Sequence, residues 1–215
     1  MSISLLSFYT PEYQPLANVT LPNKQEYCDK LEYLHLVKTT PYGNKDNYYA
    51  FQRIQYLRDL LFASENDLEA VLVLNIHTMV MNFNTKIESF LDNEHDFYIC
   101  KDVNGINAGT FLIKKSDWSK KWLDFILSKE SVHKNHCWFE QKLIQDNWEL
   151  PEFKDKVKIL PHPSINSYFY NIYNWPETTP GHFNKGDFIL HLPGLGMEQR
   201  INIFKSDAVK DKIIK

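Results

Sequence analysis

Short apolar runs alternate with amphipathic stretches along the first two thirds of the chain. Ile3–Tyr9 is an apolar run that ends at a Thr-Pro pair, and residues 70–74 are five apolar residues in succession. A run without polar alternation is typical of a strand covered on both faces, as in a parallel sheet between helices. We therefore predict an α/β fold with one mostly parallel central sheet flanked by helices.

The remaining elements follow from apolar spacing and from turn residues. The spacing predicts helices over residues 22–31, 48–61, 118–127 and 137–148, and strands over residues 33–37, 97–100 and 110–113. From residue 161 onward prolines and glycines are frequent, so we expect loops to dominate there. Residues 186–194 are the exception, a short apolar strand that brings His191 to its carboxyl end.

Size, charge and cysteine content narrow the class of protein. A chain of 215 residues, 43% of them hydrophobic, can bury one sizeable core, and we predict a single domain over residues 1–215. The net charge of -3, without a basic run longer than two residues, argues against a nucleic-acid partner. Three widely spaced cysteines favour a reducing, cytoplasmic setting. No apolar run approaches the roughly 20 residues of a membrane span.

A side-chain amide and two small residues stand before one predicted strand. Asn107, Ala108 and Gly109 are expected to form a turn in which a polyhydroxyl ligand can approach the backbone closely. The alternative is an ordinary connection between regular elements, and the motif alone does not separate the two.

Two histidines are predicted to follow apolar strands. In an extended backbone Asn75 and His77 would point the same way, toward one ion or phosphate in the crevice beyond the strand ends. His191 precedes Pro-Gly in a similar position, so the two imidazoles could converge on a metal ion that bridges two phosphates. The alternative is that each is a hydrogen-bonded structural group.

Other candidate side chains lie on the predicted helices. Glu140 and Gln141 either belong to a solvated helix face or stabilise an oxocarbenium-like transition state. Arg53 either meets a nucleotide phosphate or completes a salt bridge. The chain has no His-x-x-x-His pair, no phosphate-binding glycine-rich loop and no G-x-S-x-G motif, which disfavours kinase, dinucleotide-dehydrogenase and serine-hydrolase functions.

An ordered set of motifs resembles the GT-A-fold glycosyltransferases, the family that includes yeast galactosyl- and mannosyltransferases and plant xyloglucan xylosyltransferases. The likeness covers most of the chain. The matching positions are Asn23-Lys24, Tyr27-Cys28, Tyr33, Arg53, Arg58-Asp59-Leu60-Leu61, residues 71–82, residues 107–119, Leu123-Asp124, Glu140-Gln141, Asn166-Ser167-Tyr168, residues 186–191 and Gly194.

The resemblance places Asn75-Ile76-His77 at the family's Asp-x-Asp motif, where two carboxylates hold Mn²⁺ against the nucleotide diphosphate. An amide and an imidazole in their place remove about two negative charges and weaken the binding of a hard cation. The resemblance implies that Mn²⁺ (or Mg²⁺) is held by His77 and His191 with Asn75 and diphosphate oxygens. Catalysis without a metal and an inactive domain are the alternatives.

The same resemblance assigns the donor pocket. It implies that residues 1–105 bind the nucleotide and residues 106–215 the donor sugar and the acceptor. Gln141, with Glu140 beside it, would lie next to the anomeric carbon. The donor-binding positions would be Phe8, Tyr9, Thr10, Arg53, Asn75, Asn107, Ala108 and Gly109, with Leu195 and Gly196 near the phosphates.

The implied function is transfer of a sugar from a nucleotide diphosphate donor, with a UDP-sugar favoured, to a glycan or glycoprotein hydroxyl with retention of configuration. Yeast and plant relatives carry an amino-terminal membrane anchor that this sequence lacks, which favours a soluble viral or bacterial enzyme, in the host cytoplasm if viral. A nucleotide-sugar or glycan-binding module without activity is the second hypothesis. A nucleotide-dependent enzyme of another class, such as a methyltransferase, is the third.

Overall fold

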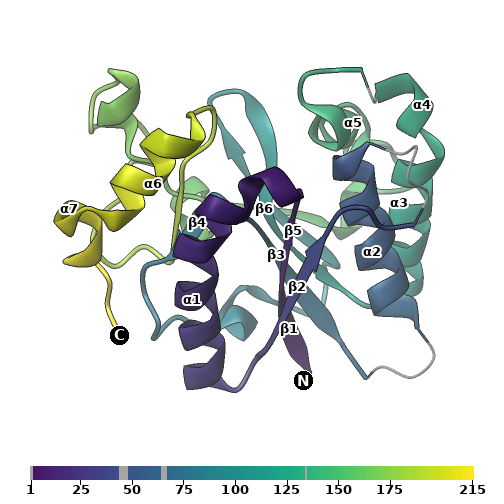
Figure 1. Ribbon diagram of the computed structural model, residues 1–215. Coiled ribbons are helices and arrows are strands. Elements are labelled where there is room, and N and C mark those ends of the chain that lie inside the picture. Colours follow the sequence, from purple (N-terminus) through teal and green to yellow (C-terminus); the bar gives the residue numbers. More distant parts are fainter. Residues whose placement is uncertain (1, 44–47, 64–66, 134) are drawn as a thin grey trace.

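A six-stranded mixed sheet forms the centre of the protein (Figure 1). The computed structural model describes residues 2–43, 48–63, 67–133 and 135–215. The strand order is β2-β1-β3-β6-β5-β7. Three of the five pairings are parallel, and β6 runs antiparallel to both neighbours, which confirms a mostly parallel sheet. The strands are β1 (Ile3–Tyr9), β2 (Leu34–Thr39), β3 (Ala70–Asn75), β5 (Phe97–Asp102), β6 (Gly105–Lys114) and β7 (Val157–Leu160).

Helices cover both faces of this sheet. Figure 1 shows α2 and α3 on one side and α1 on the other, with α6 and α7 beyond α1. A separate two-stranded ladder joins β4 to β8. The bounds are α1 (Gln14–Leu31), α2 (Tyr49–Phe62), α3 (Asp117–Ser128), α4 (Glu130–His133), α5 (Phe139–Asn147), α6 (Met197–Lys205), α7 (Asp207–Lys210), β4 (Thr78–Val80) and β8 (Ile189–His191).

The central strand β3 supplies side chains to two hydrophobic cores. Val71 and Val73 pack into the core under α2, α3 and α5. Leu72 and Leu74 point the opposite way, into the core between the sheet and α1. Successive side chains of a strand alternate between faces, so an uninterrupted apolar run is what a sheet covered on both sides requires. The expectation for residues 70–74 is confirmed.

Helix α1 begins eight residues before the predicted start at Pro22. The ring of Pro22 removes the amide that would bind the carbonyl of Asn18. Both residues lie on the exposed face of α1, where water can bind that carbonyl instead. Burial of the opposite face, including Leu16 and Tyr27, outweighs the local cost of the proline. The segment between Tyr9 and Pro22 is therefore mostly helical.

The predicted turn at residues 107–109 lies inside strand β6, so that part of the prediction is wrong. The strand is irregular at this point, because Ile99 pairs with Phe111 whereas the next residue, Cys100, pairs with Asn107. The intervening residues of β6 bulge away from β5. The amide and small residues mark this bulge, which turns the backbone locally without ending the strand.

Two further expectations need correction. Residues 76 and 77 form a turn between β3 and β4, so the extended backbone assumed for Asn75 and His77 ends at Asn75. Beyond residue 161 the chain is not dominated by loops throughout, because α6 and α7 bury Phe204 and Val209 in a third hydrophobic core. Their apolar positions are sparse in sequence and contact residues that are distant along the chain.

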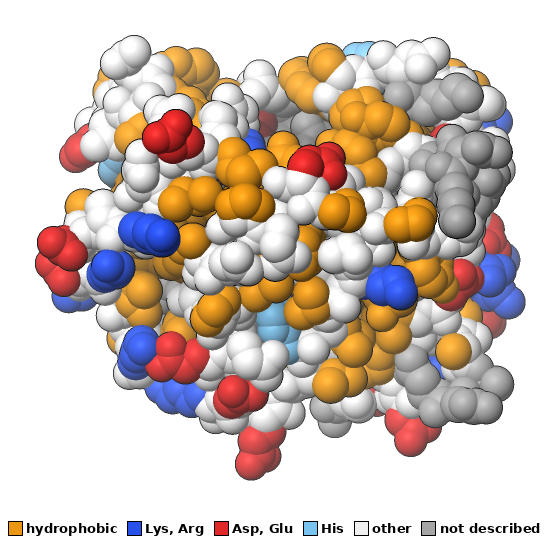
Figure 2. Space-filling model, viewed as in Figure 1, with side chains coloured by type: hydrophobic (Ala, Val, Ile, Leu, Met, Phe, Trp, Pro, Cys, Tyr) orange, Lys and Arg blue, Asp and Glu red, His pale blue; other side chains and the backbone are white. Residues whose placement is uncertain are grey.

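Apolar and basic side chains occupy different parts of one face of the molecule (Figure 2). Hydrophobic side chains are spread over the middle of the face in Figure 2, and Lys and Arg side chains lie in small groups nearer its margins. Among the described residues, no helix combines the length and the apolar character that a bilayer span needs.

Candidate functional site

A cavity of about 640 Å³ opens beyond the carboxyl ends of β1 and β3. The upper edge of the molecule is hollowed between the parts that carry α5 and α6 (Figure 2). Predicted residues from both halves of the chain line the cavity, and they are Phe8, Tyr9, Thr10, Arg53, Asn75, His77, Asn107, Ala108, Gly109, Glu140 and Gln141. The volume is in the range of small-ligand sites.

Three predicted residues lie beside the cavity instead of lining it. Leu195 and Gly196 follow Pro193 and Gly194, and it is these two that reach the cavity wall. Leu195 packs instead against the third hydrophobic core. His191 is 1% exposed and lies behind Gly109, because a Cβ atom built on Gly109 would come within 2.9 Å of its Nε2.

Arg53 connects three elements of the site. From α2 its Nη1 donates a hydrogen bond to Asn75 Oδ1 at the end of β3. Its Nη2 donates to the carbonyl of Ala108 in the β6 bulge, at 3.1 Å, and to Glu140 Oε1 on α5, at 2.5 Å. Both Nη atoms are thus engaged by protein groups, which favours the salt-bridge alternative for Arg53.

Glu140 lies at the start of α5 and is 7% exposed, so it does not belong to a solvated helix face. Burial raises the pKa of Glu140, and the positive charge of Arg53 opposes this rise. The ion pair joins two side chains that are both more than nine-tenths buried. Removing one partner of such a buried ion pair strongly destabilises the folded protein, because the other charge stays buried without a partner.

Amide side chains of α5 hold the β6 bulge in place. Gln141 Oε1 accepts a hydrogen bond from the amide of Ala108, at 3.0 Å. One turn later Gln145 Nε2 donates to the carbonyl of Ile106, at 2.8 Å. Only the first of these two side chains lines the cavity. The bulge and the start of α5 therefore form one rigid wall.

His77 and His191 meet although they are far apart in sequence. Their ring centroids are 4.8 Å apart with an interplanar angle of 29°. The register of β4 with β8 produces this contact, because Thr78 pairs with His191. His191 Nδ1 lies 2.7 Å from Asn166 Oδ1, which can only accept, so Nδ1 carries the proton and Nε2 a free lone pair.

The surroundings of both imidazoles disfavour their protonated, charged forms. Burial lowers the pKa of His77 and of His191 well below the usual value, and the positive charges of Arg200, Lys24 and Arg53 act in the same direction. The surroundings of the histidine pair thus carry a positive potential. A cation bound beside the histidine pair would be repelled by the same positive charges.

The residues predicted to hold Mn²⁺ or Mg²⁺ do not fit such an ion. These cations prefer carboxylate, carbonyl and water oxygens. The side-chain oxygen of Asn75 accepts a hydrogen bond from Arg53, and the free Nε2 of His191 is covered by Gly109. Over the described ranges, no three His, Cys, Asp or Glu side chains form a group that could hold one ion. His77 and His191 are brought together, but without oxygen ligands.

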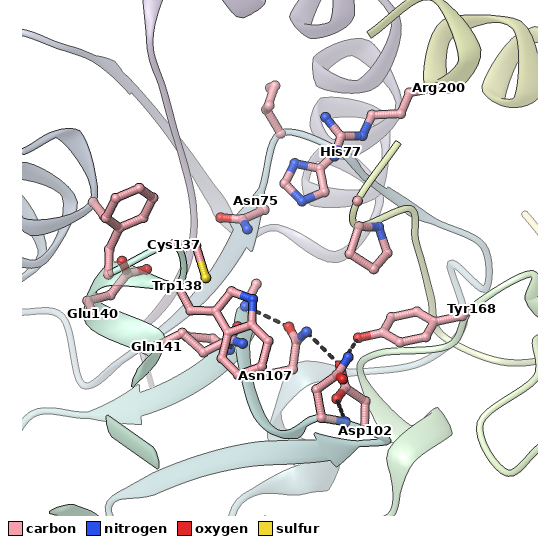
Figure 3. A pocket seen from close by; sticks show the side chains of 18 of the residues that line it. Asn75, His77, Asp102, Asn107, Cys137, Trp138, Glu140, Gln141, Tyr168 and Arg200 are labelled. Carbon is pink, nitrogen blue, oxygen red and sulfur yellow. Dashed lines mark hydrogen bonds between the residues drawn. The ribbon is translucent and has the colours of Figure 1, made fainter. Parts of the chain in front are cut away.

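A second group of cavity residues was not predicted from the sequence. Asp102, at the end of β5, accepts hydrogen bonds from Asn107 Nδ2 and from the hydroxyl of Tyr168, at 2.9 and 2.7 Å (Figure 3). The Asn-Gly pair at residues 104–105 could have predicted the hairpin that places Asp102 here. No local signal marks Tyr168, or Arg200 on α6.

Lys24 is a buried cation directly beneath the site. Its Nζ donates to the carbonyl of Asn75 at 2.8 Å, and its side chain has no exposed surface. Burial lowers the pKa of Lys24 to about 7. Thr78 Oγ1 also donates to the Asn75 carbonyl, at 2.7 Å, so that carbonyl keeps a partner if Lys24 is replaced.

This burial predicts a pH-dependent stability. Between about pH 7 and the usual lysine pKa the unfolded chain binds a proton at Lys24 that the folded protein does not bind. The free energy of unfolding should therefore rise with pH across this window. We expect Lys24→Met to flatten the rise and to stabilise the protein most at pH 7 or below. Denaturant unfolding at pH 6.5 and at pH 9 measures both, and equal slopes for the two proteins would contradict the prediction.

Comparison with solved structures reveals a common fold. A glycosyltransferase involved in the glycosylation of the major capsid of PBCV-1 superposes with a TM-score of 0.76 at 17% identity, over 95% of this chain and 99% of that one. An active-site mutant of LgtC superposes with a TM-score of 0.62 at 12% identity, over 97% of this chain and 100% of that one. The central sheet and its helices are therefore a GT-A glycosyltransferase fold.

Two yeast proteins are similar in sequence. An uncharacterized alpha-1,2-galactosyltransferase of Schizosaccharomyces pombe is 24% identical over 88% of this chain and 66% of its own length. A probable alpha-1,6-mannosyltransferase of Saccharomyces cerevisiae, MNN10, is 34% identical over 35% of this chain and 20% of its own length. The chain thus spans less than two thirds of either relative.

The sequence profile of a glycosyltransferase family covers most of the elements that build the cavity. It matches residues 57–202, which include β3, the β6 bulge, the start of α5, and β8 with His191. The match extends over more than half of the 215 residues. This protein belongs to the galactosyl transferase GMA12/MNN10 family.

Proposed function

We propose that this protein transfers a sugar from a nucleotide diphosphate donor, with a UDP-sugar favoured, to a hydroxyl of a glycan or glycoprotein. One observation carries the proposal. The ends of β1 and β3, the β6 bulge and the start of α5 all line one cavity. The chain that forms this cavity belongs to a glycosyltransferase family. Ligands of open α/β sheets bind in such a crevice beyond the strand ends.

The donor is proposed to lie across both halves of the chain. The nucleotide would contact residues 8–10 at the end of β1 and Asn75 at the end of β3, within the part predicted to bind it, residues 1–105. The sugar would lie against the β6 bulge, where Asn107 Oδ1 binds the amide of Gly109 at 2.8 Å and leaves a small-residue surface. Gln141, with Glu140 behind it, would then face the anomeric carbon.

Aromatic side chains at the cavity mouth suggest where an acceptor binds. Trp138 and Trp175 both line the cavity and are 40% and 45% exposed. Tyr170 stacks on Trp175 with an interplanar angle of 10°. Exposed aromatic groups beside a cavity are typical of ligand-binding grooves, and a sugar ring can pack on such flat faces. The acceptor proposed for this mouth is a carbohydrate or a glycosylated protein.

The proposed reaction retains the anomeric configuration. The bond between the anomeric carbon and the diphosphate oxygen breaks, and its electron pair stays on the diphosphate. The acceptor hydroxyl bonds to the same face of the carbon, and its proton passes to the departing diphosphate. Gln141 would stabilise the oxocarbenium-like transition state, and Glu140, paired with Arg53, would hold the start of α5 in position behind it. No enzyme nucleophile takes part.

A donor panel tests the proposal. Thermal shifts with UDP-, GDP- and CMP-sugars and with S-adenosylmethionine measure which ligand prefers the folded state. We expect UDP-sugars to raise the melting temperature and S-adenosylmethionine to leave it unchanged. Transfer is then assayed with oligosaccharide acceptors and with capsid glycoprotein, since one similar structure belongs to an enzyme of capsid glycosylation. Stabilisation by S-adenosylmethionine alone would instead favour a methyltransferase.

Gln141→Ala is expected to lower kcat for sugar transfer on the order of 10²-fold, because one preorganised polar group near developing charge is lost. Donor affinity should change little. Gln145→Ala is the control, since this side chain lies one turn away and outside the cavity, and the variant removes its amide-to-backbone hydrogen bonds to Asn104 and Ile106. Equal losses in the two variants would indicate that Gln141 only supports the bulge.

The second candidate function is a binding module for nucleotide-sugars or glycans. The absence of carboxylates at residues 75 and 77, the positions implied to hold a metal ion, favours it. The two functions differ in turnover. Binding of a UDP-sugar without transfer or donor hydrolysis, with any acceptor or metal tested, would support the binding module. Turnover that falls in Gln141→Ala and not in Gln145→Ala supports the enzyme.

A further inference from the structure

The charged side chains that line the cavity are unevenly paired. Arg53 and Glu140 neutralise each other. Asp102 accepts hydrogen bonds from Asn107, from Tyr168 and from the backbone amide of Asn104. The remaining charged group is Arg200, and none of the ion pairs formed within the described part of the chain includes it.

Arg200 is held in place without being neutralised. It is 6% exposed, and its Nε donates a hydrogen bond to the carbonyl of Leu192 at 2.8 Å. A guanidinium has five N–H donors and stays protonated, so four donors remain beyond this anchor. Figure 3 shows its guanidinium reaching from α6 toward the ring of His77, above Asn75. A fixed and buried positive charge that borders a cavity calls for an anionic ligand.

The surrounding backbone adds to this charge. Helix α6 begins after Gly196, which has no side chain to cap the first amides. Gly194 lines the cavity, and a Cβ atom built on it would meet nothing within 4 Å, so its backbone is open. The amino terminus of a helix carries a partial positive charge and free N–H groups. The anchored guanidinium and the amino end of its own helix thus approach one side of the cavity.

A divalent cation is poorly suited to the same place. Asn75 and His77 are the residues that the resemblance implies as metal ligands, neither is a carboxylate, and the Asn75 side chain is engaged by Arg53. The positive charges of Arg53 and Arg200 both act on the pair of histidines. A diphosphate bound at this place thus needs another positive group to offset its negative charge.

We propose that Arg200 binds the diphosphate of the donor and offsets part of its negative charge as it departs, in place of a divalent metal ion. This inference rests on the proposed function. As the bond from the anomeric carbon breaks, its electron pair moves to the diphosphate oxygen, and the Nη–H groups of Arg200 donate hydrogen bonds to the anion. The guanidinium keeps its protons, and the acceptor proton passes to the diphosphate, so the step balances without a metal.

The sequence supplies a well-matched control. The chain has three arginines, of which Arg53 and Arg200 line the cavity and Arg58 does not. Arg58 lies on α2, partly exposed, and pairs with Asp124 at 2.9 Å. Arg58→Met and Arg200→Met therefore remove the same charge and the same hydrogen-bond donors from two different places. An exposed ion pair contributes little to stability, so Arg58→Met should fold normally.

The test is calorimetric titration of the whole chain with UDP, inorganic pyrophosphate and uridine, in EDTA and again with Mn²⁺. We expect UDP and pyrophosphate to bind wild type in EDTA, and Arg200→Met to weaken both by roughly 10- to 100-fold, the range for loss of charged hydrogen bonds. Uridine affinity should not change, and Arg58→Met should match wild type. Arg200→Lys keeps the charge without the planar fork, so an intermediate affinity supports the assignment even if Arg200→Met fails to fold.

Other outcomes overturn specific claims. If UDP binds only after Mn²⁺ is added, and Arg200→Met then binds as well as wild type, the inference fails and the proposed function survives. A different outcome is that pyrophosphate binding depends on Arg200 but no nucleotide-sugar is bound or transferred. That result would support the anion site and contradict the proposed function. If neither UDP nor pyrophosphate binds under either condition, both are wrong.

Discussion

Arg53→Ala is expected to lower the free energy of unfolding by about 3–5 kcal/mol and to abolish sugar transfer. The substitution leaves the carboxylate of Glu140 buried without a partner, and it removes the hydrogen bonds that join α2 to Asn75 and to Ala108. Loss of stability and loss of the cavity wall therefore have one cause. Denaturant unfolding measures the first, and a transfer assay at a temperature where the variant stays folded measures the second.

A double variant separates charge from position. Arg53→Met combined with Glu140→Leu leaves no unpaired charge in the core, so much of the lost stability should return. Transfer should not return, because the hydrogen bonds from Arg53 to Asn75 and to Ala108 remain lost. A single Arg53→Ala variant within about 1 kcal/mol of wild type would show that the pair lies in a wetter environment than its burial indicates.

Gly109→Ala is expected to reduce donor affinity more than about tenfold and to destabilise the protein by about 1–3 kcal/mol, as overpacking does in other cores. The added Cβ would lie 2.3 Å from Cε1 of His191 and 2.9 Å from Asn107 Oδ1. The imidazole cannot move freely, because Asn166 binds its Nδ1 and His77 stacks on its face. The bulge must shift instead, and it shifts toward the donor-sugar side.

The origin of this effect can be tested with a second substitution. His191→Ala removes the ring that the new methyl group would contact, so Gly109→Ala should cost less stability in that background than in wild type. Such non-additivity is expected for residues in direct contact. Additive effects would place the strain elsewhere, for example at Asn107.

Much of the fold could be predicted because its signal is local. Apolar runs and helical spacing located β1, β3, α2, α3 and α5 to within a few residues. Errors arose where a local signal met a tertiary effect. Pro22 does not begin α1 because burial of the opposite face extends the helix past it, and residues 107–109 do not end a strand because α5 holds them as a bulge.

The site was predictable in part for a similar reason. Strand ends are local features, and they indicated Asn75 and His77 at the cavity. The amide and small residues at 107–109 were a second local signal, and the resemblance to a family added residues 8–10. Asp102 and Arg200 were not found, since a carboxylate after a strand and an arginine in a weakly apolar segment have no distinctive spacing.

The sequence by itself determined the order of the main strands and helices from β1 to α5, the two-sided burial of β3, and the absence of carboxylates at residues 75 and 77. Only the tertiary structure decided that Arg53 pairs with Glu140, 87 residues away, that His77 stacks on His191, and that Arg200 lies beside them outside the ion pairs of the described residues. Periodicity records which face of an element is buried. It does not record which distant element covers that face, and the charge of this site depends on that pairing.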